Sequence, residues 1–383
     1  LSRVDHMYML KATYPDRISM VAGYNEFFRS HLHFVFKLNQ IIPKKNYVND
    51  IPSIKAMNSI IKQNGLVCFA PEGMSSIYGT NQPVTPGTAH FLKHHKIPVY
   101  FMEMRGEYLV STKVIQDERY GDTYGKMMLL FTPEDLERLS EEEITDIINE
   151  KFRHDEYLWN KEKRIKYKHK GNKLAKNLSH ICYRCPVCGS EFEMEEDGNI
   201  LRCKKCGNAI EINDYYDFLK ASDNAKFPIS PSKWVEWERC LIIRDIRHDD
   251  NYSFTEHVKL GYLPKYKYVS KKKTSELCGE GDLTIDHSGI HYRGTKLGEE
   301  FNFDLDYNGQ YSLPIVTDTS FFSLYVNGEY HDIFPDRAVV GKMLLLVEEM
   351  HRLHVNVWKN FKWNDYMYDE SVDLEEVFFK DVK

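Results

Sequence analysis

Two Cys-x-x-Cys pairs constrain the fold of this chain more than any other feature of its sequence. The first pair is Cys185 and Cys188, the second is Cys203 and Cys206, and a glycine follows each pair. Four thiolates in this pattern close a tetrahedron around Zn²⁺ and leave no coordination position open for catalysis. The sequence therefore predicts a structural zinc site within a zinc ribbon over residues 181–213, with free or redox-active cysteines as the alternative.

The other cysteines and the composition agree with this interpretation. Five of the eight cysteines lie between Cys182 and Cys206, a clustering that indicates metal binding in a reducing cytoplasm rather than disulfide bonds. Hydrophobic residues make up 42% and charged residues 28%, as in a globular protein, and no run of about 18 apolar residues occurs. The formal charge of −6 argues against a protein that coats nucleic acid.

A length of 383 residues exceeds one compact core, so we expect several domains. Residues 1–150 indicate an α/β domain, because a short apolar strand at 66–70 precedes a predicted helix at 88–95 and a capping box at Ser140 and Glu143. A basic helical linker is predicted over residues 151–180, followed by the zinc ribbon. Residues 214–383 form a mixed region in which Trp234 is a candidate core or docking residue.

The last part of the chain alternates apolar and polar residues from residue 281 onward. This period of two, with an Asn327-Gly328 turn between two of the segments, predicts antiparallel strands. An amphipathic helix is expected to begin at Asp336. Strands followed by one helix resemble a pleckstrin-homology-like barrel, so we expect an α+β domain with a C-terminal helix at the end of the chain.

A Pro-Glu-Gly turn at residues 71–73 follows the strand at 66–70, and a predicted helix and the pair Pro98-Val99 come after it. This order resembles the glycerolipid acyltransferases related to 1-acylglycerol-3-phosphate acyltransferase. The resemblance covers about residues 1–150 and implies the α/β fold of that family. It also implies that Glu72 acts at the catalytic site and positions the acceptor headgroup, with the backbone near Gly73 at the phosphate or the developing oxyanion.

The family's second motif ends in a basic residue that meets the acceptor's phosphate, and Lys44 and Lys45 stand at that place. The family usually has arginine there, whereas lysine holds a phosphate as a point charge. The third motif also differs, because Met74 and Ser75 follow Gly73 where the family has threonine and arginine. Ser75 is the expected substrate-binding residue at the position of that arginine, which leaves lysophospholipids other than lysophosphatidic acid open as acceptors.

The family's catalytic motif is a histidine, four residues and an aspartate. Asp5 fits the aspartate, and the resemblance then places its histidine partner just before Leu1. His6 cannot take that part, since Lys11 stands at the required offset from it. A neutral imidazole would take the proton of the acceptor hydroxyl, while Asp5 would fix the tautomer and stabilise the imidazolium.

The resemblance thus implies an enzyme that transfers a fatty acyl group from acyl-CoA or acyl-carrier protein to the hydroxyl of a lysophospholipid. Such a protein is expected in the cytoplasm, peripheral at the inner face of the membrane, with zinc as a structural cofactor and no nucleic-acid partner. The basic run at 161–176 is most simply a solvated face, and a membrane contact is the other interpretation. Two alternative functions remain: a nucleic-acid-binding zinc-ribbon protein, and a catalytically inactive relative that binds lipid.

Overall fold

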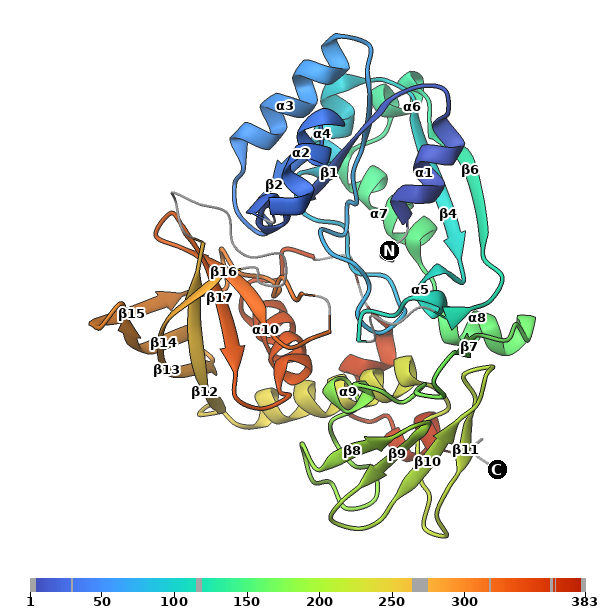
Figure 1. Ribbon diagram of the computed structural model, residues 1–383, viewed down its shortest axis with the longest axis vertical. Coiled ribbons are helices and arrows are strands. Elements are labelled where there is room, and N and C mark those ends of the chain that lie inside the picture. Colours follow the sequence, from blue (N-terminus) through green and yellow to red (C-terminus); the bar gives the residue numbers. More distant parts are fainter. Residues whose placement is uncertain are drawn as a thin grey trace.

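The computed structural model describes residues 5–28, 30–114, 119–263, 275–316, 318–358, 361 and 363–379. The predicted histidine partner of Asp5 and the outermost residues of the first and last predicted domains lie outside these ranges. Figure 1 shows an N-terminal α/β region, a small sheet at one end of the molecule and a curled C-terminal sheet with helices. The predicted mixed α/β class is confirmed at this coarse level.

A small parallel sheet forms the base of the N-terminal region. Its strand order is β2-β1-β3, and β1 pairs in parallel with both neighbours. Parallel strands require crossover connections. Helix α2 lies in the connection from β1 to β2, and α3 lies in the connection from β2 to β3 on the other side of β1. The elements are α1 (Asp5–Thr13), β1 (Ile18–Gly23), η1 (Tyr24–Phe28), α2 (Ser30–Leu38), β2 (Ile42–Lys44), α3 (Ile51–Lys62) and β3 (Leu66–Cys68).

The second half of this region is built on an antiparallel pair, β4 (Val99–Arg105) and β6 (Tyr124–Phe131). Helix α4 (Thr88–His95) spans the predicted helix, and α7 (Glu141–Phe152) begins with the predicted capping box, so both predictions are confirmed. Apolar side chains of α4, β6, α6 and α7 form a small core of their own. The remaining elements are α5 (Glu107–Val110), β5 (Arg119–Tyr120) and α6 (Pro133–Arg138).

Residues 151–180, predicted as a basic helical linker, are helical mainly in α8 (Glu156–Lys163). This helix ends at Arg164, whose φ of +57° is left-handed. Strand β7 (Lys168–His169) then pairs with β5, and η2 (Leu178–His180) follows. Tyr167 is fully buried, and its N–H donates to the Asp214 carbonyl at 2.7 Å. The ring of Tyr167 packs against its neighbours, because an aromatic ring gains from burial, whereas most of the basic residues around it are exposed.

The cysteine-rich segment carries a four-stranded antiparallel sheet of order β11-β10-β9-β8. Its strands are β8 (Met194–Asp197), β9 (Ile200–Cys203), β10 (Ala209–Ile212) and β11 (Phe218–Lys220). In Figure 1 this sheet lies at the lower end of the molecule, below α9 (Pro231–His248). We call residues 181–220 the metal module.

Six antiparallel strands of order β15-β14-β13-β12-β17-β16 curl into an open half-barrel beside α10 (Figure 1). The Asn327-Gly328 turn is confirmed, because it joins β16 to β17 with φ angles of +50° and +83°. Helix α10 begins at Val340 rather than at Asp336, since β17 continues to Pro335 and the Asp336 carboxylate bonds His257 instead of capping the helix. The elements are β12 (Ser253–Tyr262), β13 (Glu276–Asp286), β14 (Gly289–Lys296), β15 (Glu299–Leu305), β16 (Phe322–Val326), β17 (Glu329–Pro335), α10 (Val340–His354), η3 (Asp365–Tyr368) and α11 (Leu374–Phe379).

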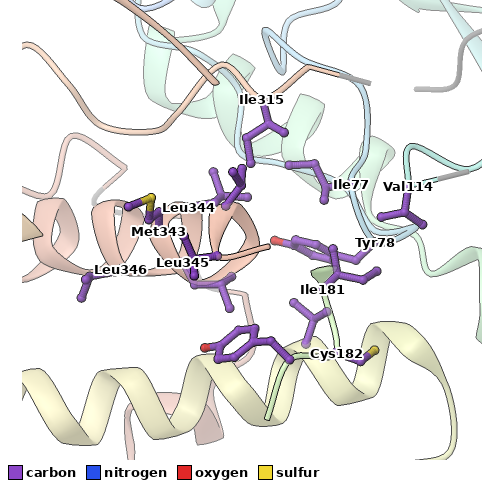
Figure 2. Packing of buried hydrophobic residues seen from close by; sticks show 14 of the residues in the cluster. Ile77, Tyr78, Val114, Ile181, Cys182, Ile315, Met343, Leu344, Leu345 and Leu346 are labelled. Carbon is purple, nitrogen blue, oxygen red and sulfur yellow. The ribbon is translucent and has the colours of Figure 1, made fainter. Parts of the chain in front are cut away.

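One hydrophobic core joins the N-terminal region, the metal module and the C-terminal helices. Figure 2 shows Ile77 and Tyr78, from the long loop after β3, beside Leu344 and Ile181. Trp234 on α9 is fully buried in the same core. Residues on both sides of each predicted domain boundary therefore share one core. Within the described ranges, no helix is both long enough and apolar enough to cross a bilayer.

Candidate active-site cleft and metal centre

A cleft of about 2720 Å³ is lined by the N-terminal region on one side and by the half-barrel on the other. Small-molecule pockets have volumes of roughly 300–1,000 Å³, so this cleft has room for an elongated substrate. Segments α1, β1, β3 and β4 contribute to the first wall, and the second wall includes the ends of β15, β16 and β17. Many lining side chains are apolar or aromatic, among them Met20, Phe36, Met57, Phe91, Leu277 and Phe334.

The Pro-Glu-Gly turn forms part of the first wall. Gly73 lines the cleft with a φ of +77°, a left-handed conformation that glycine adopts without strain. Glu72 lies behind this turn with an exposed fraction of 3%, and its Oε1 accepts a hydrogen bond of 2.7 Å from the Gln82 N–H. Burial raises the pKa of Glu72, and the negative charge of Asp5 adds to this effect.

Asp5 lies in the first turn of α1 and lines the same cleft. Its charge also contributes to the raised pKa of the Cys68 thiol, which burial brings to about 11. The charge of Asp5 thus acts on both Cys68 and Glu72, although Glu72 itself is not among the residues that line the cleft. Ser75 lines the cleft as well.

The two predicted phosphate-binding lysines differ in their surroundings. Lys44 lines the cleft, and its Nζ donates to the Lys45 carbonyl at 2.9 Å. Burial lowers the pKa of Lys44, with the nearby charge of Asp50 opposing the change. The Nζ of Lys45 instead donates to the Tyr325 hydroxyl at 2.8 Å and lies 4.5 Å from the centre of that ring. The structure thus brings Lys44 to the cleft and uses Lys45 in a contact with the half-barrel.

Sequence reasoning missed a group of charged residues at the end of β4, all of which line the cleft: Arg105, Glu107 and Glu156. The Glu156 carboxylate accepts a hydrogen bond of 2.6 Å from the Gly106 N–H and lies 3.7 Å from Arg105. Burial raises the pKa of Glu156 to about 7 and that of Glu107 to about 8. A signal was present, because Gly106-Glu107 follows an apolar strand much as the Pro-Glu-Gly turn does.

A buried hydrogen-bond chain connects the Glu72 turn to the C-terminal helices. The Gln82 side chain donates to the Tyr78 hydroxyl at 3.2 Å, and Arg239 of α9 donates to the same oxygen at 2.7 Å. The Arg239 guanidinium also donates to Glu348 and Glu349 of α10, at 2.7 and 2.6 Å, and only 2% of its side chain is exposed. The shape of the cleft wall at Glu72 thus depends on α9 and α10.

The predicted four-cysteine group is confirmed as a cluster that could bind a metal such as zinc. The Sγ atoms of Cys185, Cys188, Cys203 and Cys206 all lie within 4.8 Å of one another, with separations of 3.6 Å for Cys185 and Cys206 and 3.7 Å for Cys188 and Cys203. Zinc–sulfur bonds of about 2.3 Å in a tetrahedron place sulfurs about 3.8 Å apart, so the cluster fits zinc. Among the described residues, no other group of three His, Cys, Asp or Glu side chains is arranged in this way.

Backbone geometry around each cysteine pair prepares the sulfurs for a metal. Gly189 and Gly207 have φ angles of +69° and +76°, and the N–H of each donates to the carbonyl of the first cysteine in its pair. The two N–H groups that follow Pro186 donate to the Cys185 sulfur, and the Asn208 amide approaches it at 3.6 Å. Such donors orient the ligands and stabilise thiolates. Cys182 is buried nearby but is not a member of the cluster.

Comparisons with protein-family models, with curated proteins and with solved structures found no match for this chain. Fold and site together define a mixed α/β protein with a half-barrel, a large cleft and a four-cysteine metal module. Asp5, Glu107 and Glu156 line the cleft, whereas four thiolates would leave no open position on a metal.

Proposed function

We propose that this chain is an acyltransferase that moves a fatty acyl group from acyl-CoA or acyl-carrier protein to the hydroxyl of a lysophospholipid. The observation that carries the proposal is the convergence of Asp5 and the Glu72 turn on one large cleft. The resemblance requires these two acids, which are far apart in the sequence, to share one site. The apolar lining of the cleft supports the proposal further, since an acyl chain leaves water on binding.

In the proposed reaction, the hydroxyl oxygen of the acceptor forms an ester bond with the acyl carbonyl carbon, and the carbon–sulfur bond of the thioester breaks. The hydroxyl proton passes to a general base and then to the leaving thiolate, so the products are a phospholipid and a free thiol. Asp5 orients the histidine base that the resemblance assigns to the preceding segment and stabilises its charged form. Ser75 offers its hydroxyl to the acceptor.

Lys44 is the proposed phosphate partner, because it lines the cleft while Lys45 contacts Tyr325. A phosphate beside Lys44 would favour its charged form and so offset the effect of burial on its pKa. A single lysine recognises the charge of a phosphate rather than its shape. This arrangement suits a lysophospholipid acceptor without requiring a terminal phosphate.

Exposed apolar side chains near the cleft support contact with a membrane surface, the source of the acceptor. Tyr14, Phe34 and Leu38, on or beside α1 and α2, have exposed fractions of 83%, 72% and 67%. Tyr14 and Val35, which is also exposed on α2, line the cleft. Apolar and aromatic residues of this kind insert at the boundary between headgroups and acyl chains.

The proposal is tested by transfer of radiolabelled acyl groups from acyl-CoA to a panel of lysophospholipids, with protein that carries the complete catalytic motif. We expect transfer to at least one acceptor, and Asp5→Asn should lower kcat about 100-fold or more, because the base loses its orientation. Glu137→Gln, on the exposed surface of α6, removes one negative charge away from the cleft and should leave kcat unchanged.

Absence of transfer to every acceptor would contradict the proposal. Lipid binding without transfer would then identify a catalytically inactive relative. A salt-sensitive shift of DNA or RNA at physiological ionic strength would instead favour the nucleic-acid alternative.

A further inference from the structure

Glu107 occupies an unusual position in the wall of the cleft. It begins α5, separated by one residue from the end of β4, lines the cleft and has an exposed fraction of 2%. Its Oε1 atom has no hydrogen-bond partner among the residues that the structure describes. Buried oxygens almost always have a partner, so an orphaned one at a cleft points to a ligand that supplies the missing hydrogen bond.

The groups around Glu107 favour its neutral form. The negative charges of Glu156 from α8 and Asp5 from α1 both raise its pKa, and the charge of Glu107 in turn raises the pKa of Tyr167. Arg105, at the end of β4, is engaged with Glu156 and with Glu103. Burial is the main reason that the pKa of Glu107 rises to about 8, although its own N–H opposes the change. A neutral carboxyl group at this position has one O–H to donate.

We propose that Glu107 is a substrate-binding and catalytic residue whose neutral carboxyl group donates a hydrogen bond to the carbonyl oxygen of the acyl thioester. The inference rests on the proposed acyl transfer. Negative charge develops on that oxygen as the hydroxyl attacks, and a donor already fixed in a water-poor wall stabilises it without reorganisation. The proton stays on Glu107 throughout, so the bonds made and broken in the transfer are unchanged.

The position of Glu107 relative to Asp5 suits this role. Asp5 acts on both Glu72 and Glu107 through its charge, and Asp5 and Glu107 both line the cleft. The acceptor headgroup at the Glu72 turn and the thioester carbonyl at Glu107 would then meet beside Asp5. A reaction between two substrates needs this arrangement of adjacent binding groups.

Two variants of Glu107 distinguish a neutral carboxyl group that donates a hydrogen bond from an ionised carboxylate that acts as a base. Glu107→Gln keeps a hydrogen-bond donor of the same shape, so kcat at pH 7 should stay within about threefold of the wild-type value. Wild-type kcat should fall as pH rises above about 8, and Glu107→Gln should not show this fall. Glu107→Leu removes the donor and should lower kcat about 100-fold with a smaller change in KM. Glu137→Gln serves as the control for loss of one charge.

An infrared titration tests the carboxyl group without any substrate. The difference spectrum between the wild-type protein and Glu107→Gln should contain the carbonyl band of a protonated carboxyl group at pH 6.5, and this band should fall to half its intensity near pH 8 and vanish at higher pH. Thermal melting of each variant shows that it is folded.

The outcomes distinguish this inference from the proposed function. A protonated carboxyl band that titrates, together with no acyl transfer, would confirm that Glu107 is neutral at pH 6.5. It would overturn both the thioester as the ligand of Glu107 and the acyltransferase proposal. Acyl transfer without a protonated carboxyl band would overturn the role of Glu107 as a neutral hydrogen-bond donor. Acyl transfer in the wild-type protein with Glu107→Gln as inactive as Glu107→Leu would overturn it too. In both cases the acyltransferase proposal would remain. Wild-type kcat in Glu107→Leu would overturn any role of this residue in catalysis.

Discussion

The metal module and the cleft are built in opposite ways. The four clustered cysteines of the module lie within 22 residues of one another, from Cys185 to Cys206, and hydrogen bonds inside each cysteine pair shape the site. The cleft instead takes Asp5 from the first helix, Gly73 and Ser75 from the loop after β3, and aromatic side chains from the half-barrel beyond residue 300. One site is local in sequence, and the other exists only when distant segments have packed.

This difference teaches where each site is vulnerable. The module depends on its ligands and on backbone turns that the sequence encodes within a few residues. The cleft depends on contacts far from its own residues, above all on the buried Arg239 network that holds Tyr78 and Gln82 behind Glu72. The four predictions below test this contrast, beginning with the largest expected effect.

Removal of the metal should have the largest effect. Chelation of zinc, or Cys203→Ser, should remove on the order of 10 kcal/mol of folding free energy from the module, because the thiolates lose their common partner. The expected results are one zinc per chain by mass spectrometry and rapid proteolysis of residues 181–220 after chelation. Cys278→Ser, on β13 outside the cluster, is the control and should retain its zinc. A chain that contains no zinc, or that resists chelation, would contradict the prediction.

Loss of the buried arginine should come next. Arg239→Met leaves Glu348 and Glu349 buried without their cation and should destabilise the protein by roughly 3–5 kcal/mol. We expect a lower melting temperature together with weaker acyl transfer, because Tyr78 and the Glu72 turn lose their anchor. Arg247→Met, on the exposed side of the same helix, is the matched control. Adding Glu348→Gln should restore part of the stability. If it does not, the loss of stability in Arg239→Met is not caused by the unpaired buried carboxylates.

The pH dependence of stability should change by a smaller amount in Glu107→Gln. The pKa of Glu107 is raised from 4.5 to about 8 on folding, so its neutral form favours the folded state at low pH and this contribution is lost as pH rises from about 4.5 to about 8. Thermal melting between pH 5 and pH 9 should therefore show wild-type stability declining relative to Glu107→Gln. If the melting temperatures of the two proteins change with pH in parallel, burial does not raise the pKa of this carboxyl group.

The smallest effect is expected at a glycine of the metal module. Gly189 has a φ of +69°, and a Cβ added there meets nothing within 4 Å, so Gly189→Ala should cost only the left-handed conformation, about 1–2 kcal/mol. Gly309→Ala is the control, because a Cβ there also meets nothing and its φ is not left-handed. Chemical denaturation of the zinc-loaded protein measures both. An equal cost at the two glycines would show that backbone conformation is not what matters at Gly189.

Local patterns predicted the local elements well. The capping box at Ser140, the turn at Asn327 and Gly328 and the cysteine cluster each involve residues close in sequence, whose preferences act before any tertiary contact forms. In the predicted linker, most basic residues around Tyr167 are exposed, but the Tyr167 ring itself is fully buried. Composition cannot show which member of a charged segment packs inward.

The candidate site could be predicted only in part. A family resemblance named Asp5 and Glu72, and the structure adds that the charge of one acts on the other. No pattern distinguished Lys44 from Lys45, since their surroundings differ only through Tyr325 of the half-barrel. Glu107 was missed for the same reason, because the raised pKa of a carboxyl group comes from burial rather than from neighbours in the sequence.

The sequence by itself determined the four-cysteine metal cluster, the helix caps and the hairpin turns, because covalent proximity and backbone preference fix them. Only the tertiary structure decided that the half-barrel forms the second wall of the cleft and that Arg239 supports Glu72 through Tyr78. The tertiary structure alone also decided which acidic side chains are buried. Burial and long-range hydrogen bonds arise from packing of the whole chain, so no segment carries them alone.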